Sequence, residues 1–204
     1  DALGVVEAVD AEQHHVGVAQ PSADVGHRPR RLVASAQPLD LVDIDRREFR
    51  LKDALEPIRN NHDFILIDCP PALGAITRNA LAAADLLLIP TQAEYFSAYA
   101  LRNMMGLIRR TREMDNPNLS YRILVTMLDR RNRTHRNIHE QLRSTFGAGV
   151  FNTVIELDTK LRESPIAGQP ITHYKSAARG STQYRVLAQE LMEYAKETEN
   201  QQTS

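Results

Sequence analysis

The sequence predicts an α/β domain with a doubly wound, mostly parallel sheet flanked by helices. Short apolar runs, typical of strands that are covered on both faces, lie at residues 64–67, 86–90 and 123–128. Segments with apolar residues three or four positions apart, the spacing of amphipathic helices, lie at residues 47–60, 76–84, 97–112, 134–146 and 181–198. Ligands of such sheets bind at the carboxyl ends of the strands, so we look for a functional site there first.

The overall composition is that of a soluble globular protein large enough to bury a core. The 204 residues are 42% hydrophobic and 25% charged, and 25 Lys and Arg stand against 26 Asp and Glu. With so little net charge, any contact with nucleic acid must come from a local cluster. One cysteine, Cys69, excludes a disulfide framework and a multi-cysteine metal site, and indicates a reducing compartment. No apolar run approaches the length that crosses a membrane, and the first residues do not read as a signal peptide.

The chain divides into regions of different character. Residues 1–46 have scattered apolar positions without periodicity, and we expect an atypical leader there that is disordered or non-homologous. Residues 47–198 are expected to form the domain, with a short tail at 199–204. The leader contains three histidines without metal-ligand spacing, and we expect no metal site at His14, His15 and His27.

Asp68 closes the first predicted strand and is followed by Cys69, Pro70 and Pro71. A strand-terminal aspartate is compatible with a carboxylate that binds Mg²⁺ beside nucleotide phosphates, and also with a helix cap or a loop ion pair. The paired prolines fix the direction in which the chain leaves the strand, as a phosphate-binding loop requires. For Cys69 the pattern favours a small buried side chain over a catalytic thiol.

Three segments in collinear order make the sequence recognisable. They read FILIDCPPALGAITRNALAAADLLLIPTQAEYFSAYAL from residue 64, ILVTMLDRRNR from residue 123, and VFNTVIELDTKLRESPIAGQPITHYKSAARGSTQYRVLAQEL from residue 150. In them residues 47–190 resemble the ParA/Soj-type partition ATPases, a deviant-Walker branch of the P-loop NTPases. The resemblance implies a cytoplasmic, nucleoid-associated ATPase that dimerises around ATP and Mg²⁺, binds DNA nonspecifically and is stimulated by a ParB-type partner.

The resemblance also implies roles for single residues. Asp68 is the expected catalytic aspartate and binds Mg²⁺ through water. The residues expected near the nucleotide are Pro70, Met127, Asp129, Glu163 and Pro165. The expected DNA contacts are Arg131, Lys160 and Arg162. The loop at 91–96 matches a family segment near the dimer interface, and is equally compatible with an ordinary surface loop.

A cluster of arginines is compatible with the expected DNA contacts but does not distinguish them from an ordinary charged surface. Residues 109–136 hold eight arginines and three acidic residues. This surplus is compatible with a phosphate-contacting patch and with a solvated face in an arginine-rich protein.

One family feature is absent from the sequence. The family's phosphate loop carries lysine after glycine, but this chain has no Gly-Lys dipeptide, and its first lysine is Lys52. We therefore expect a chain that lacks the P-loop segment and does not hydrolyse ATP, and a noncatalytic interaction module is the alternative. Reductases of the nitrogenase iron-protein type need cluster cysteines that one cysteine cannot supply. Septum-positioning relatives need a basic membrane helix, whereas residues 190–204 hold one lysine and four glutamates.

Overall fold

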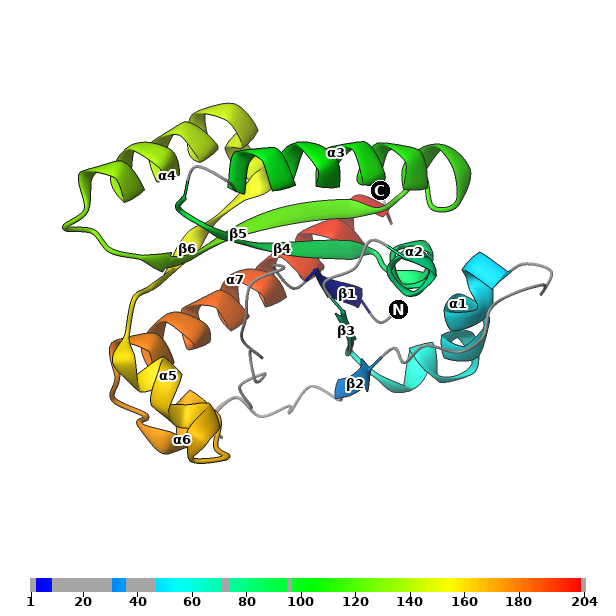
Figure 1. Ribbon diagram of the computed structural model, residues 1–204. Coiled ribbons are helices and arrows are strands. Elements are labelled where there is room, and N and C mark those ends of the chain that lie inside the picture. Colours follow the sequence, from blue (N-terminus) through cyan, green and yellow to red (C-terminus); the bar gives the residue numbers. More distant parts are fainter. Residues whose placement is uncertain (1–2, 9–30, 36–46, 71–73, 95–96, 203–204) are drawn as a thin grey trace. The chain divides into compact units, whose positions relative to one another are not determined.

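The computed structural model describes residues 3–8, 31–35, 47–70, 74–94 and 97–202. These residues form two compact units, which are described separately. The first unit holds the described residues up to Pro90 together with 97–123, and the second holds 91–94 and 124–202. Both units combine strands with helices, as Figure 1 shows.

The first unit contains the parallel sheet that the sequence predicts. Its strands are β1 (Leu3–Ala8), β2 (Arg31–Ser35), β3 (Phe64–Cys69), most of β4 (Leu86–Gln92) and the start of β5 (Ser120–Leu128). They lie in the order β2-β3-β1-β4-β5, and the pairs β2–β3, β3–β1 and β1–β4 are parallel. The predicted strands β3 and β4 are confirmed. Their apolar runs are explained by burial, since Ile65, Ile67, Leu86 and Leu87 are at most 2% exposed.

Two strands, β1 and β2, lie within residues 1–46, the segment for which we expect an atypical leader. Both pair with β3, with Glu7 and Ser35 on either side of Asp68 in the register. Neither reads as a buried strand, because Gly4 and Glu7 interrupt the apolar pattern of β1 and Arg31 and Ser35 flank a short run in β2. The pairing with β3 is a tertiary interaction that a sequence pattern does not contain.

The helices of the first unit follow the predicted segments closely. They are η1 (Arg47–Phe49), α1 (Arg50–Leu55), η2 (Glu56–Asn61), α2 (Ala75–Ala83) and α3 (Ser97–Met114). The predicted helix at 47–60 is a short α-helix between two 3₁₀ segments, since Pro57 has no N–H to continue the α-helical ladder. The Asn79 side chain accepts from the Leu51 N–H at 3.2 Å and joins α2 to α1.

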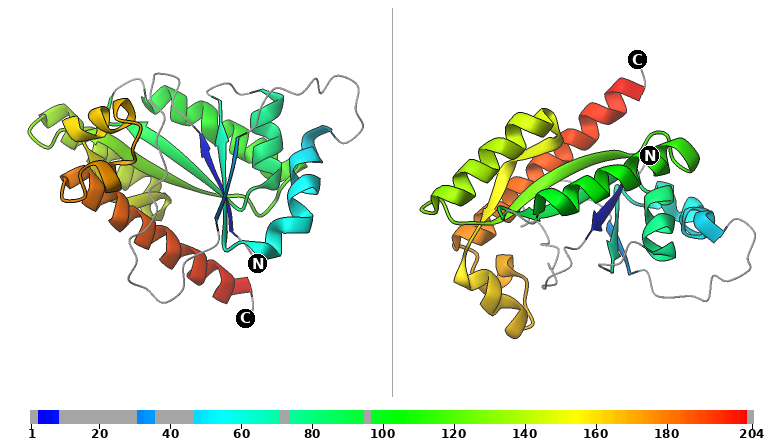
Figure 2. Two further views of the ribbon diagram at one scale, coloured as in Figure 1. Left: turned by 90° about the horizontal axis from the view of Figure 1, so that it is seen from below. Right: turned by 45° about the horizontal axis from the view of Figure 1, so that its top comes forward.

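The second unit is built around the end of β5 and the neighbouring strand β6 (Val150–Glu156). Its helices are α4 (Arg133–Phe146), the short η3 (Gly147–Gly149), α5 (Thr159–Ile166), α6 (Ile171–Tyr174) and α7 (Arg179–Gln202). Figures 1 and 2 show α4 and α7 on opposite sides of β6. Asn132 caps the start of α4 by accepting from the Thr134 N–H, and Gly147, with φ of 51°, ends this helix.

Side chains of α7 bind the free backbone edge of β6. The Glu190 carboxylate accepts from the Asn152 N–H at 2.6 Å and from the Thr153 N–H at 2.8 Å, and also from the Thr153 hydroxyl at 2.6 Å. One end of the same helix provides Gln183, whose Oε1 accepts from the Glu156 N–H at 2.9 Å. An exposed row of N–H groups invites pairing with another chain, and here a helix satisfies part of that row.

The predicted helices at 76–84, 97–112, 134–146 and 181–198 are confirmed as α2, α3, α4 and α7. The strand β6 was not predicted, because Asn152, Thr153 and Glu156 interrupt its apolar pattern. Within the described part of the chain, no helix has both the length and the apolar character needed to cross a bilayer.

Candidate functional site

The carboxyl end of β3 presents Asp68 to solvent. Asp68 is exposed although it follows Ile67, which is 1% exposed, because side chains alternate between the two sides of a strand. Pro70, two residues after Asp68, is also exposed. The carboxylate is therefore accessible, which the expected role as a Mg²⁺-binding aspartate requires.

Cys69 is buried, unlike the exposed Asp68 that precedes it. It is 2% exposed, and burial together with the nearby charge of Asp68 raises the pKa of its thiol to about 12. A thiol is a good nucleophile only as thiolate, so this side chain is inert at neutral pH. The interpretation of Cys69 as a small core residue is confirmed.

The carboxyl end of β5 has an unusual backbone. Met127 has φ of 52°. Among the described residues, it is the one residue other than glycine that has a positive φ. Such a conformation costs energy for a residue with a side chain, and residues of this kind are enriched at functional sites. It occurs where β5 turns into the loop that carries Asp129 and Arg131.

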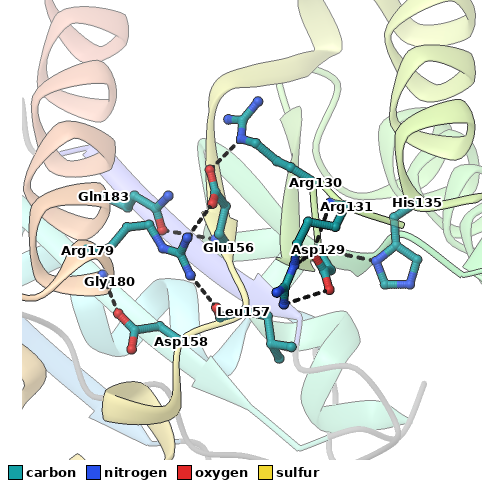
Figure 3. Close-up of polar contacts among 10 residues, drawn as sticks. All are labelled: Asp129, Arg130, Arg131, His135, Glu156, Leu157, Asp158, Arg179, Gly180 and Gln183. Carbon is teal, nitrogen blue, oxygen red and sulfur yellow. Dashed lines mark hydrogen bonds and ion pairs between the residues drawn. The ribbon is translucent and has the colours of Figure 1, made fainter. Parts of the chain in front are cut away.

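That loop is held by its own hydrogen bonds, which Figure 3 displays. The Asp129 carboxylate accepts from the Arg131 N–H at 2.9 Å and from the Arg131 guanidinium at 3.2 and 3.4 Å. The Arg131 N–H, followed by its guanidinium, lowers the pKa of the Asp129 carboxyl. The Asp129 N–H donates to Nδ1 of His135 at 3.1 Å, which anchors the loop to α4. The Arg131 side chain remains 91% exposed and can reach a ligand in solution.

A cleft of about 450 Å³ opens at the carboxyl ends of β5 and β6. It is lined by Leu128, Asp129, Arg130, Arg131, Glu156, Leu157 and Arg179. The two strand ends are joined by the Leu157 N–H, which donates to the Leu128 carbonyl at 3.0 Å. The position is the one at which open α/β sheets bind their ligands.

Glu156 organises one wall of this cleft (Figure 3). Its carboxylate, with the side chain only 11% exposed, accepts from Arg130 Nε at 2.5 Å and pairs with Arg179 Nη1 at 3.0 Å. Arg179 also donates to the Leu157 carbonyl at 2.6 Å. A buried carboxylate needs such partners, and it holds both guanidinium groups at the cleft. Sequence reasoning missed Glu156 and Arg179, because neither forms a motif with its neighbours in the chain.

Asp158 connects the beginnings of two helices beside the cleft. One oxygen of its carboxylate caps α5 by accepting from the Lys160 N–H at 2.9 Å, and the other accepts from the Gly180 N–H of α7 at 3.0 Å. Desolvation acts to raise the pKa of this carboxyl, but the N–H groups of Gly180 and Lys160 outweigh it and the pKa is lowered. The ion pairs and hydrogen bonds of residues 156–158 thus fix α5 and α7 relative to β6.

Outside the lining of the cleft, Lys160 and Glu163 of α5 and Tyr174 of α6 form a hydrogen-bonded group. Lys160 Nζ donates to both oxygens of Glu163, at 2.8 and 2.7 Å, and the Tyr174 hydroxyl donates to Glu163 Oε2 at 3.0 Å. The bond with Lys160 and then that with Tyr174 lower the pKa of the Glu163 carboxyl. Arg162 and Pro165, on the same helix α5, are exposed.

The predicted site residues fall into separate groups. Asp68 and Pro70 belong to the first unit. In the second unit the structure joins Asp129 with Arg131, and Lys160 with Glu163. Their functional roles stay predictions. Of the loop at 91–96, Thr91 and Ala93 are buried, and Tyr95 and Phe96 lie outside the described residues, as do His14, His15 and His27.

A second cavity, of about 340 Å³, lies in the first unit at the amino ends of β4 and β5. Its polar groups already serve the fold. Arg59 Nη2 binds both oxygens of Asp85 at 2.8 Å, and the Asn116 amide donates to the carbonyls of Leu81 and Ala84 at the end of α2. The carboxyl ends of the strands remain the candidate site.

Comparison with known sequences identifies the family. The chromosome partitioning protein ParA of Caulobacter vibrioides is 36% identical over 193 residues, which are 93% of this chain and 70% of that protein. The chain belongs to the ParA family of partitioning ATPases. ParA of Myxococcus xanthus is 41% identical over 76% of this chain, and Soj of Bacillus subtilis is 37% identical over 80%. The chain spans 55% and 65% of the length of these two ParA-family proteins.

A model of an AAA domain family, AAA_31, matches residues 27–121. Residues 27–46, part of the segment for which we expect an atypical leader, lie inside this match. The resemblance was not evident in residues 27–46, because their apolar positions are scattered and show no periodicity.

Solved structures agree with the P-loop NTPase fold of the ParA family. Cobyrinic acid a,c-diamide synthase from Mycobacterium smegmatis, with bound ADP and magnesium, gives a TM-score of 0.63 at 25% identity over 76% of this chain and 57% of that one. A putative plasmid partition protein from Borrelia burgdorferi, bound to AMPPNP, gives a TM-score of 0.59 over 74% of this chain and 57% of that one. At 21% identity the second likeness concerns the fold alone.

Proposed function

We propose that this chain acts in DNA segregation as part of a ParA-type nucleotide switch. In this proposal ATP and Mg²⁺ close a homodimer, the dimer binds DNA without sequence preference, and a ParB-type partner stimulates hydrolysis in the complete enzyme. Binding to DNA would keep the protein on the nucleoid, in the cytoplasm. The main support, beyond family membership, is the loop after β5, which presents a 91% exposed arginine at the rim of a polar cleft.

The described residues fit a nucleotide with its metal ion. Mg²⁺ prefers oxygen ligands and keeps several waters, and Asp68 offers an exposed carboxylate at a strand end. The described residues contain no group of three or more potential ligands, so water and phosphate oxygens would complete the coordination. When bound, the ion would neutralise phosphate charge. Asp68 would hold the ion through water, and Pro70 would direct the loop that leaves β3.

The cleft in the second unit supports a role in binding the nucleotide base. There the backbone at Met127 and Asp129 would contact the base, with Leu128 and Leu157 providing apolar surface. Glu163 and Pro165, on α5, would contact the nucleotide or the partner subunit. These roles are taken from the family resemblance. They are supported by the positions of the residues, which lie at the end of β5 or on α5.

DNA would be bound by cations beside this cleft. Arg131, Lys160 and Arg162 are the proposed contacts, and all three lie in the second unit. Contacts of this kind bind phosphate and carry no sequence information, so the affinity should depend strongly on salt and weakly on sequence.

The chain by itself is proposed not to hydrolyse ATP. It contains no Gly-Lys dipeptide, and the lysine of a phosphate loop supplies much of the affinity for the phosphates. We expect a Kd for ATP in the millimolar range or weaker, measured by calorimetry with and without Mg²⁺. Turnover of ATP by this chain, or tight Mg²⁺-dependent binding, would contradict this part of the proposal. A chain without turnover that still binds a ParA-type or ParB-type protein would fit the alternative, a noncatalytic interaction module.

Substitution of the exposed arginine tests the DNA-binding proposal. In the complete, ATP-bound protein Arg131→Glu should weaken binding to duplexes of any sequence, and the slope of log K against log salt should fall by about 0.9 for each phosphate that the variant no longer binds. Arg50→Glu, at an exposed position on α1 in the first unit, makes the same charge change and serves as the control. Retention of Arg131→Glu on DNA-cellulose equal to that of the parent and the control would refute the assignment.

A further inference from the structure

Lys160, one of the proposed DNA contacts, already has a partner inside the protein. Its ammonium group has three N–H donors, and two of them bind the carboxylate of Glu163 at 2.8 and 2.7 Å. Glu163 lies one helical turn further along α5, so the pair forms within a single element. The Tyr174 hydroxyl, from α6, donates to the same carboxylate at 3.0 Å and limits its movement.

This arrangement competes with DNA for the same cation. A carboxylate and a phosphate bind an ammonium group through the same charge-assisted hydrogen bonds, so one excludes the other from those donors. The side chains of Lys160 and Glu163 are 42% and 39% exposed, which leaves the pair accessible to a phosphate. Arg131 is also paired, with Asp129, but at the longer distances of 3.2 and 3.4 Å, and its side chain is 91% exposed. The two cations are therefore not equally available.

We propose that Glu163, held by Tyr174, is an internal competitor that keeps Lys160 from DNA phosphate until its carboxylate is drawn away. The inference rests on the proposed DNA-binding function of this surface and adds its regulation. Glu163 is also the acidic residue that we place near the nucleotide or the partner subunit. If the Glu163 carboxylate turns toward a donor group on the nucleotide or on the partner subunit, its oxygens move away from Lys160 and the ammonium group is released for DNA.

The variant Glu163→Gln, in the complete protein with ATP and Mg²⁺ present, tests the competition. Fluorescence anisotropy with a labelled duplex of arbitrary sequence should show binding about two- to five-fold tighter than that of the parent, the range that an exposed ion pair carries. The salt slope should steepen by about 0.9, since one more phosphate contact forms. Glu193→Gln, at an exposed position on α7, removes the same charge and should have a smaller effect.

A double variant separates the competition from a general change in charge. If Glu163 acts through Lys160, Glu163→Gln should bring no gain in a Lys160→Met background. An equal gain in both backgrounds would overturn the proposal. So would an affinity of Glu163→Gln equal to that of the parent while Arg131→Glu still weakens binding, and in that case the DNA-binding function would stand.

The reactivity of the lysines gives a second readout that needs no DNA. The hydrogen bond with Glu163 raises the pKa of the Lys160 ammonium, so Glu163→Gln should expose more free amine to acetic anhydride. Mass spectrometry should then find Lys160 acetylated several-fold faster, while Lys52 and Lys196 react as in the parent. An unchanged rate at Lys160 would overturn the competition. Absence of DNA binding in both parent and Glu163→Gln would overturn the proposed function and this inference together.

Discussion

Removal of the Glu190 carboxylate should destabilise the edge of the sheet that forms the cleft. In Glu190→Ala three donors of β6 lose their acceptor, the N–H of Asn152 and the N–H and hydroxyl of Thr153. Asn152 is exposed, so its N–H can bind water instead. Thr153 is 7% exposed, so both of its donors would remain buried and unsatisfied.

The magnitude follows from the two buried donors. Each unsatisfied buried donor costs about 1–3 kcal/mol, and partial access of water reduces the sum, so we expect a loss of about 2–4 kcal/mol in the free energy of unfolding. For a protein of this size that corresponds to a fall in Tm of roughly 5–15 °C. Glu190→Gln should lie between the parent and Glu190→Ala, since an amide keeps one acceptor oxygen.

Urea denaturation followed by circular dichroism measures this difference as a shift in the midpoint at constant m-value. Glu193→Ala, at an exposed position one turn further along α7, is the matched control and should stay within about 0.5 kcal/mol of the parent. If Glu190→Ala and Glu193→Ala unfold at the same urea concentration, the helix does not stabilise β6 through this carboxylate. The reasoning on the edge strand would then be refuted.

Two further predictions concern ionisable groups near the strand ends. The pKa of Asp158 is lowered in the folded protein, so its contribution to stability is present above its ordinary pKa of 3.8 and is lost as the pH falls through the folded value. Asp158→Ala should therefore cost about 1 kcal/mol, typical of removing an N-cap, at neutral pH and progressively less in acid, and a cost independent of pH from urea titrations would contradict the role of the charge. For Cys69, a pKa of about 12 and full burial predict no reaction with Ellman's reagent at neutral pH until the protein unfolds, and a prompt reaction in the native state would show that the thiol is accessible.

Local patterns were sufficient for β3, β4 and α7. The run at β4 is apolar because most of this strand is buried, the run at residues 64–67 of β3 alternates between buried and half-buried side chains, and the stripe on α7 recurs at the helical period. The aspartate at the end of β3 could be singled out for the same reason, since a charge directly after a buried run is conspicuous. The burial of Cys69 followed from its place in that strand.

Elements that depend on partners were beyond the reach of such patterns. The strands β1 and β2 exist through their pairing with β3, and β6 contains polar residues whose hydrogen bonds are satisfied by α7. Neither kind of contact leaves a periodic signal, because the partners lie far away in the sequence.

The amino-acid sequence by itself determined the α/β class, the order of most elements and the aspartate at the end of β3, because each depends on interactions between near neighbours in the chain. Only the tertiary structure decided which charges are engaged. It joined Glu156 to Arg130 and Arg179, paired Arg131 with Asp129 at an exposed position, and paired Lys160 with Glu163, to which the hydroxyl of Tyr174 also donates. The reason is that the strength of a charge as a ligand depends on its distance to other charges and on its access to water, and folding sets both.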